Sequence, residues 1–426
     1  MSKHIEPFDV EGVRADFPIL SREVGGDIST PGAGPDDSTP LVYLDNGATS
    51  QTPERVIDAM STYYREYNSN VHRGVHHLSQ EASIAYETAH DRLAEFIGAS
   101  GGREEIVFTK NTTESMNTIA YSWGLAELGP GDEIVLSEME HHAALVTWQQ
   151  IAKKTGADVK FVRIDDDGRL DMDHARELIG ENTEMVSVVH VSNVLGTVNP
   201  VADLADLAHA NDAYIFADGA QAAPNRPVDV EELGVDFYAF SGHKMCGPTG
   251  IGVLYGKEHL LEAIDPFLYG GMMIRKVSFE DSTWNELPWK FEAGTPLIAE
   301  GIGLAEAADY IDEIGMERIQ RHELELADYA MEQLEGFDDV EVYGPPRGED
   351  RSGVVSFNLD GVHAHDLASI MNDYAVAIRA GDHCTQPLHE TLGTAASARA
   401  SFYLYNTREE VDTLLEAIDS ARQLFA

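Results

Sequence analysis

Six short apolar runs alternate with helical stretches along the middle of the chain, and this alternation constrains the fold more than any other feature. The runs are EIVFT, DEIVLSEM, VKFVRI, MVSVVHVS, AYIFADGA and DFYAFSG. They are rich in β-branched and aromatic residues without regular polar alternation, which is typical of strands buried on both faces of a parallel sheet. Helical stretches such as 79–98, 116–128 and 200–211 lie between them. We therefore predict an α/β fold whose mostly parallel sheet is covered by helices.

The pattern changes after the segment FEAGTP. A long helical stretch at 298–334 is followed by VEVYG and VVSFNLD, and then by two shorter helical stretches. We expect a large domain over 41–296 and a smaller α+β domain over 297–426. An N-terminal segment, 1–40, is expected to pack on the small domain, and it carries a loop rich in Gly, Pro, Ser and Asp at Ser21–Pro40.

The chain is strongly acidic, with 74 acidic residues against 29 basic ones and a formal net charge of −45. The acidic residues are spread along the whole sequence instead of forming a tail. Such a surface repels nucleic acids and anionic membranes, so we expect neither as a partner. Scattered carboxylates are typical of proteins adapted to high salt, where screening over a few ångströms removes the self-repulsion.

The chain has only 2 cysteines. This number excludes a disulfide framework and fits a reducing compartment. The start MSKHIEPFDV has no apolar signal region, and no later apolar run is long enough to cross a membrane. We therefore expect a cytoplasmic protein. No His/Cys spacing resembles a zinc site, so we predict no metal.

Two of the apolar runs end in polar groups. Those of one run suit the binding of an anion, and those of the other suit a cationic partner. VFTKNTTESMN leads from a strand to Thr112 and Thr113 at the start of a helix, where hydroxyls and free N–H groups form a phosphate seat. An ordinary threonine cap is the alternative. YIFADGAQ ends at Asp218, whose carboxylate is costly to bury without a cationic partner. Its alternative is a helix N-cap.

Two further strand ends supply an amine and two imidazoles. FYAFSGHKMCGPTG contains Lys244, which is a candidate Schiff-base amine or else an ordinary surface lysine. LSEMEHHAAL contains His141 and His142, which by themselves are more often structural than catalytic. The carboxyl ends of parallel strands meet at one edge of a sheet. A phosphate seat, a buried carboxylate, an amine and a histidine at such an edge are what pyridoxal 5′-phosphate requires.

Motifs along most of the chain support this interpretation. They are YLDNGAT, NVHRGVHHLS, TKNTTESMN, MEHHAALVTWQ, HVSNVLGTVNP, DGAQAAP, SGHKMCGPTGIGVLYG, FEAGTP, IRAGDHCTQPL and ARASFYLYNTREEVD. From about Leu41 to the C-terminus the chain resembles the group II (Suf-type) cysteine desulfurases, in the aminotransferase class V branch of fold-type I pyridoxal-phosphate enzymes. The resemblance implies a mostly parallel seven-stranded sheet flanked by helices, plus a smaller α+β domain.

The resemblance also implies a role for each matching residue. The catalytic residues correspond to Lys244, which holds the cofactor, Cys384, which accepts the sulfur, and His141, which stacks on the cofactor ring. The further cofactor ligands correspond to Asp218, Gln221, Thr113, Ser241, His243 and, from a second subunit, Thr295. The residues near the substrate correspond to Arg399, Asn193 and Arg379.

The implied reaction converts L-cysteine to L-alanine and leaves the sulfur on Cys384 as a persulfide for iron–sulfur cluster assembly. The implied partners are a second copy of the chain, a sulfur-acceptor protein of the Suf-type system and an iron–sulfur scaffold complex. Selenocysteine lyase activity, which uses the same machinery, remains an alternative. Kynureninase-like carbon–carbon cleavage and a non-catalytic interaction subunit are more distant alternatives.

The chain departs from the usual pattern of this family at several positions. Gly47 replaces a usual alanine, Asp382 replaces the first histidine of Gly-His-His-Cys, and Thr385 stands where alanine is common. The thiolate form of Cys384 depends on nearby charge. We expect Arg379 and His383 to favour it and Asp382 to oppose it.

The acidic composition predicts that the fold weakens at low ionic strength, because unscreened carboxylates repel one another. The melting temperature, followed by circular dichroism, should rise by several degrees between dilute buffer and molar KCl. Equal melting temperatures in the two buffers would contradict this prediction.

Overall fold

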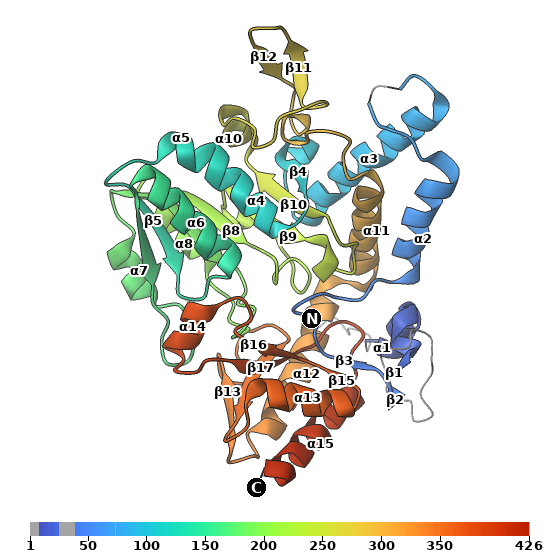
Figure 1. The fold of residues 1–426 in the computed structure, drawn as a ribbon, viewed down its shortest axis with the longest axis vertical. Coiled ribbons are helices and arrows are strands. Elements are labelled where there is room, and N and C mark those ends of the chain that lie inside the picture. Colours follow the sequence, from blue (N-terminus) through green and yellow to red (C-terminus); the bar gives the residue numbers. More distant parts are fainter. Residues whose placement is uncertain (1–7, 25–38, 73, 426) are drawn as a thin grey trace, which may run out of the picture.

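The computed structural model describes residues 8–24, 39–72 and 74–425, and a sheet of seven strands lies at its centre (Figure 1). The strand order is β4-β10-β9-β8-β7-β5-β6. β10 runs antiparallel to both of its neighbours, and the remaining neighbours pair in parallel. The strands are β4 (Ile106–Thr109), β5 (Glu133–Ser137), β6 (Asp158–Val162), β7 (Thr183–Val189), β8 (Tyr214–Asp218), β9 (Phe237–Ser241) and β10 (Gly252–Gly256). The predicted mostly parallel sheet of seven strands is confirmed.

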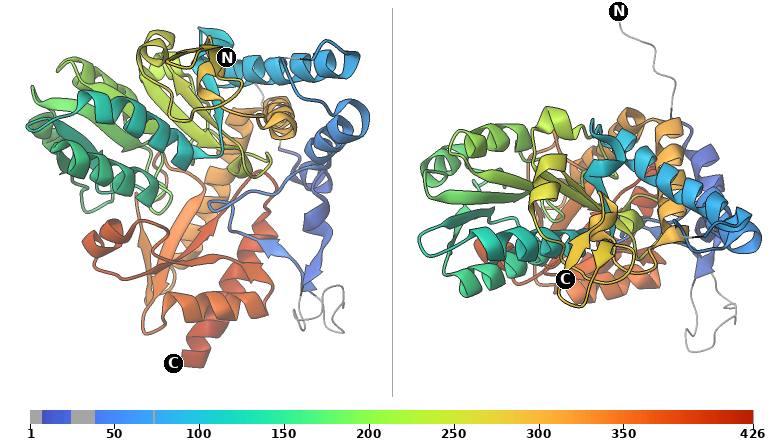
Figure 2. Two further views of the ribbon diagram at one scale, coloured as in Figure 1. Left: turned by 45° about the horizontal axis from the view of Figure 1, so that its top comes forward. Right: turned by 90° about the horizontal axis from the view of Figure 1, so that it is seen from above.

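Helices cover both faces of this sheet (Figure 2), because its strands are apolar on both faces. In β8, Ile215 and Ala217 belong to one buried cluster and Phe216 to another, since successive side chains of a strand point to opposite faces. The first cluster includes α2 (Glu54–Thr62), α3 (His77–Phe96), α7 (Met172–Leu178), α8 (Val201–His209), α9 (Val230–Leu233) and α11 (Ile298–Ile314). The second includes α4 (Thr112–Ile119), α6 (His142–Thr155) and α10 (Glu258–Ala263); α5 (Leu125–Glu127) lies beside them.

A second sheet of four antiparallel strands lies in the C-terminal part of the chain, in the order β13-β14-β17-β16. Its strands are β13 (Val340–Tyr343), β14 (Val354–Leu359), β16 (Arg379–Gly381) and β17 (Ser397–Ser401). Three helices share a separate buried cluster with it, namely α12 (Met316–Leu334), α13 (Ala364–Asp373) and α15 (Arg408–Phe425). A short helix, α14 (Gln386–Thr391), follows Cys384.

The helical stretch expected at 298–334 is divided into α11 and α12. The two helices meet at Gly315, whose φ of 96° lies in the left-handed region that favours glycine. The backbone there cannot continue the α-helix, so α12 leaves the large sheet and packs on the small one.

The N-terminal part contains α1 (Val10–Ala15) and two short strands, β1 (Glu23–Val24) and β2 (Thr39–Pro40), which pair in antiparallel fashion. β3 (Val42–Tyr43) then pairs in parallel with β15 (Val376–Ala377). Most of the loop predicted at Ser21–Pro40 lies outside the described residues. The division into 1–40, 41–296 and 297–426 stays a prediction.

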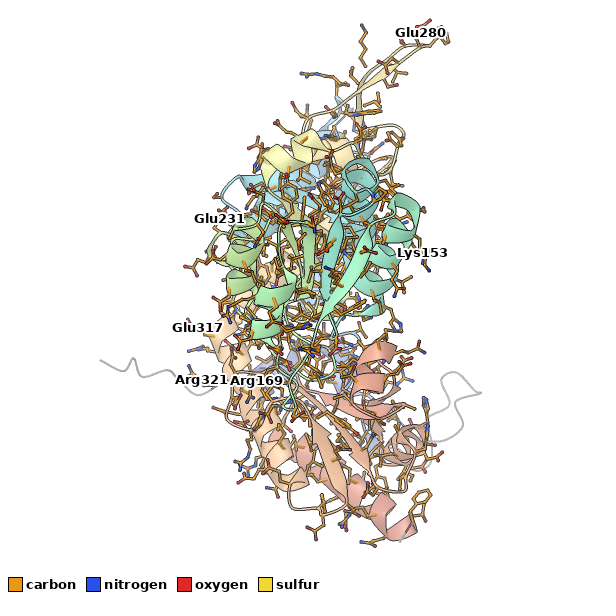
Figure 3. The ribbon with its side chains drawn as sticks, turned by 90° about the vertical axis from the view of Figure 1, so that its left-hand side faces the viewer. Lys153, Arg169, Glu231, Glu280, Glu317 and Arg321 are labelled. Carbon is orange, nitrogen blue, oxygen red and sulfur yellow. The ribbon has the colours of Figure 1, made fainter. Side chains whose placement is uncertain are left out.

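Two features concern the outside of the molecule. A hairpin of β11 (Ile274–Val277) and β12 (Ser282–Trp284), which the sequence did not indicate, projects from the large-sheet end (Figure 1). Charged side chains stand on many elements of one side, for example Glu231, Glu280 and Glu317 (Figure 3). Within the described ranges, no helix is long and apolar enough to cross a membrane.

Packing behind the end of β8 yields a testable prediction. A Cβ atom added at Gly219 would lie 2.2 Å from the ring of Tyr238, which is fully buried. Overpacking of this kind costs about 1–3 kcal/mol. Gly219→Ala should therefore lower the free energy of unfolding by about that amount in chemical denaturation.

Gly180→Ala is the matched control, since a Cβ there would have nothing within 4 Å. A Gly219→Ala protein as stable as this control would show that the close packing on Tyr238 relaxes at no cost.

Candidate active site

A cavity of about 200 Å³ lies where the carboxyl ends of the large sheet face strands of the small sheet. Both sheets contribute to its wall, because Asp218 and Ser241 end β8 and β9 whereas Arg379 and Arg399 come from β16 and β17. The predicted residues that line it are Thr113, His141, Asn193, Asp218, Gln221, Ser241, His243, Lys244, Arg379 and Arg399. Most of the predicted site is therefore brought together in one place.

Lys244 lies in the short turn Gly242–Lys244 directly after β9. Removal from water lowers the pKa of its amine to about 8, although the charge of Asp218 works in the opposite direction. A lysine with a lowered pKa is a better nucleophile near neutral pH. The alternative of an ordinary surface lysine is therefore wrong.

Asp218 is buried at the end of β8, with 3% of its surface exposed. Its Oδ1 accepts the backbone N–H of Ala220 at 2.9 Å, and burial raises its pKa. Among the described residues, no lysine or arginine forms an ion pair with it. A buried carboxylate of this kind fits the protonated nitrogen of a pyridine ring.

The start of α4 supplies the hydroxyls and N–H groups expected for a phosphate. Asn111 is the N-cap, since its side chain accepts the N–H of Glu114, so the alternative of an ordinary threonine cap is wrong. The Oγ of Ser241 lies 2.8 Å from the Oγ1 of Thr112 and accepts its N–H at 3.0 Å. Thr113 stands beside this pair in the cavity wall. The arrangement suits an anion at a helix N-terminus.

Two histidines of the wall are uncharged at neutral pH. Burial and the charge of Lys244 lower the pKa of His141 to about 4, and the same two causes lower that of His243 to about 4. The Nδ1 atom of His141 accepts the N–H of Ala143 and thereby caps α6. His141 therefore presents a neutral ring to the cavity. The Nε2 atom of Gln221 donates to the carbonyl of Gly47 at 2.7 Å.

Arg399 and Arg379 lie directly opposite each other on β17 and β16. Arg399 is buried; it donates to the carbonyl of Asn193 at 2.9 Å and to Oδ1 of Asp45 at 3.1 Å. Asp45, which the sequence did not single out, therefore holds one side of the guanidinium. Two adjacent arginines, only one of which is paired with Asp45, suit the carboxylate of an amino acid.

Gly47 explains how closely the chain approaches this guanidinium. A Cβ atom added at Gly47 would lie 3.0 Å from Cζ of Arg399, and the Gly47 N–H donates to Oγ of Ser401 at 2.8 Å. The departure from the usual alanine therefore leaves room beside the expected substrate ligand.

Cys384 is half-buried in a turn whose backbone is in the left-handed region, with φ of 48° at His383 and 60° at Cys384. His383 is buried, its Nε2 faces the carbonyl of Ser397 at 3.0 Å, and burial lowers its pKa to about 2. The expectation that His383 supplies a positive charge to Cys384 is therefore wrong. The carboxylate of Asp382 instead accepts the N–H of Cys384 at 2.9 Å.

Thr295 is one of the predicted cofactor ligands. Thr295 does not line the cavity; it lies in a separate hollow with Tyr86 and Phe108.

Glu140, which the sequence did not single out, is buried, and its Oε1 accepts the N–H of Val189 at 2.9 Å. Burial raises the pKa of Glu140 to about 8, so this carboxyl is protonated at neutral pH. Its place in the pattern SEMEHH carries no signal that distinguishes it from a surface glutamate.

The buried amine predicts a pH-dependent effect on stability. Below about pH 8 the folded chain holds a charged Lys244 whose pKa is about 8 instead of the ordinary 10.5, which costs up to about 3 kcal/mol. In cofactor-free protein at pH 7, Lys244→Met should raise the free energy of unfolding by about 1–3 kcal/mol. The gain should disappear as the pH approaches 10.5, where the unfolded lysine also loses its charge.

Lys153→Met, at an exposed lysine of α6 (Figure 3), is the control and should show no such gain. Denaturant titrations at pH 7 and pH 10 measure both variants. A Lys244→Met protein less stable than wild type at pH 7 would contradict the burial cost.

Comparison with known proteins identifies the family of the chain. The aminotransferase class-V family model matches residues 42–414. A cysteine desulfurase of Haloferax volcanii is 72% identical over 420 residues, covering 99% of this chain and 98% of that protein. The apo structure of a cysteine desulfurase from Thermococcus onnurineus NA1 superposes with a TM-score of 0.91 at 41% identity, covering 99% of this chain and 100% of that one. The chain therefore belongs to the aminotransferase class-V family, among its pyridoxal 5′-phosphate-dependent cysteine desulfurases.

Proposed function

We propose that this cysteine desulfurase transfers the sulfur of L-cysteine to Cys384 as a persulfide and releases L-alanine. The observation that carries the proposal is the place of the thiol. Cys384 is half-buried on the turn that follows β16; Arg379 and His383, which precede it in the chain, line the cavity, although Cys384 itself does not. A nucleophile on this turn lies at the edge of the cavity that Arg399 and Lys244 line.

The proposal gives a role to each predicted residue that lines the cavity. Arg399 and Arg379 bind the substrate carboxylate, with Asn193 beside them. Asp218 would keep the ring nitrogen of the cofactor protonated, and Gln221 would donate to the ring oxygen. Thr113, Ser241 and His243 would hold the phosphate. The bound cofactor supplies an electron sink for the negative charge that develops at the substrate α-carbon.

Proton and sulfur transfer fall to the chain itself. Lys244 would hold the cofactor, and its Nζ, once free, would take the proton from the substrate α-carbon. The Cys384 thiolate attacks the substrate sulfur; a sulfur–sulfur bond forms as the carbon–sulfur bond breaks, and the electron pair of the broken bond stays on the substrate carbon. Protonation of that β-carbon, and return of a proton from Nζ of Lys244 to the α-carbon, complete alanine. The neutral ring of His141 would stack on the cofactor and relay protons at its Nε2, since its Nδ1 accepts a backbone N–H.

The biological setting is part of the same proposal. The sulfur is destined for iron–sulfur cluster assembly in the cytoplasm, through an acceptor protein and a scaffold complex of the Suf-type system, and the chain is of the group II type. A homodimer is supported by exposed apolar side chains, since Phe279, between β11 and β12, is fully exposed and Val75, just before α3, is 93% exposed. Thr295 would then reach the cavity of the partner.

Replacement of the thiol tests the proposal. Cys384→Ser should keep the absorbance of the bound cofactor but lose alanine and sulfide production from L-cysteine by about a hundredfold or more. Cys246→Ala is the matched control, because Cys246 is fully buried and should not affect sulfur transfer.

Both products are measured in high-salt buffer with and without reductant. Full activity of Cys384→Ser would remove Cys384 from the reaction. Faster turnover of L-selenocysteine than of L-cysteine by both proteins would then favour the selenocysteine lyase alternative.

A further inference from the structure

We infer that His142 is a positioning residue, whose ring fixes the turn that presents Cys384 to the cavity. This turn, residues 382–386, is called the Cys384 loop below. The inference rests on the proposed role of Cys384, but it concerns a neighbour that makes no contact with the cavity, since His141 and Ala143 line it and His142 does not.

The Cys384 loop is not a conformation that its own residues prefer. His383 and Cys384 are consecutive non-glycine residues with φ of 48° and 60°. Each residue in this region costs free energy that the surrounding structure must offset. Contacts from elsewhere are therefore needed to keep the thiol in place.

Bonds within the loop define its shape but not its location. Asp382 accepts the N–H of Cys384 on its side chain at 2.9 Å and that of Thr385 on its carbonyl at 2.8 Å. These bonds close a local turn. They would move with the loop if it swung away from the large sheet.

Three hydrogen bonds join the loop to the large-sheet part of the chain. The N–H of His142 donates to the carbonyl of Cys384 at 2.7 Å, and the Nε2 atom of His142 accepts the N–H of Gln386 at 3.0 Å. The Nδ2 atom of Asn193 donates to the carbonyl of His383 at 2.9 Å. Two of the three come from His142, at the start of α6.

The ring of His142 meets a need that the loop cannot meet itself. Gln386 begins α14, so its N–H has no acceptor within the helix. The N-cap residue Thr385 makes no capping bond, because its hydroxyl donates to the carbonyl of Asp382. His142 therefore caps a helix that is distant in the sequence.

The consecutive histidines thus divide two tasks. His141 caps α6 and faces the cavity, whereas His142 holds the Cys384 loop. The third anchor, Asn193, also accepts from Arg399 through its carbonyl, so the loop and the substrate's carboxylate ligand share a support. Loss of the His142 ring should loosen the loop without disturbing the cavity.

The test compares His142→Ala and His142→Gln in the cofactor-loaded full chain. In His142→Ala, amides of residues 382–386 should exchange with deuterium about tenfold faster, the equilibrium effect of losing one hydrogen bond. The kcat for alanine formation should fall by a smaller factor, because the closed population of the loop decreases less than the open population increases. The KM for L-cysteine and the cofactor absorbance should stay unchanged.

Two further variants separate the loss of this hydrogen bond from other effects of the substitution. Gln offers an acceptor near the position of Nε2, so His142→Gln should restore exchange and kcat to within about threefold of wild type. His174→Ala is the matched control, because that ring also accepts a backbone N–H, from Arg163 at 3.1 Å, but on a different element. It should behave as wild type in every measurement.

Unchanged exchange in the loop of His142→Ala would overturn the inference, and so would a raised KM or a lost cofactor absorbance, which would place His142 in the cavity. The exchange measurement does not depend on what Cys384 does. If Cys384→Ser kept full activity while His142→Ala loosened the loop, the proposed function would fail and the positioning by His142 would stand.

Discussion

The parallel pairing of β8 with β9 is the constraint on which the rest of the site depends. Asp218 lies opposite Ala239 in this register, and the chain continues from β9 through Ser241 into Lys244. The carboxylate and the amine thereby leave adjacent strands at the same edge of the sheet. A shift of one residue would turn Asp218 to the other face. Buried apolar side chains such as Phe216 hold this register, so core packing positions the chemistry.

The cavity concentrates groups that burial drives away from their charged forms. Burial lowers the pKa values of Lys244, His141 and Arg399, and it raises that of Asp218. A cofactor with a phosphate and a protonated ring nitrogen offers partners to these groups. Binding therefore offsets the free-energy cost of burying them, and this gain favours the bound state. The site is also locally positive within a chain of net charge −45, which attracts anionic ligands while the outer surface remains acidic.

The sequence predicted which residues line the cavity better than it predicted their charge states and the contacts that hold them in place. The order of strands and helices placed Asp218, Ser241 and Lys244 correctly, because residues just past parallel strands must share one edge. His383 was expected to carry charge, but the fold buries it. The roles of Asp45 and Glu140 were missed, because each depends on a contact with a distant segment, Asp45 with Arg399 and Glu140 with Val189.

The fold class, the mostly parallel sheet and the family membership could be predicted from the sequence, because apolar periodicity and short motifs are local properties of the chain. Which groups are neutral and which are paired follows from the folded structure, since burial and distance depend on all elements at once. It also decided how the Cys384 loop is held. His142 and Gln386 are 244 positions apart in the chain, and no local pattern shows that a ring at one caps a helix at the other.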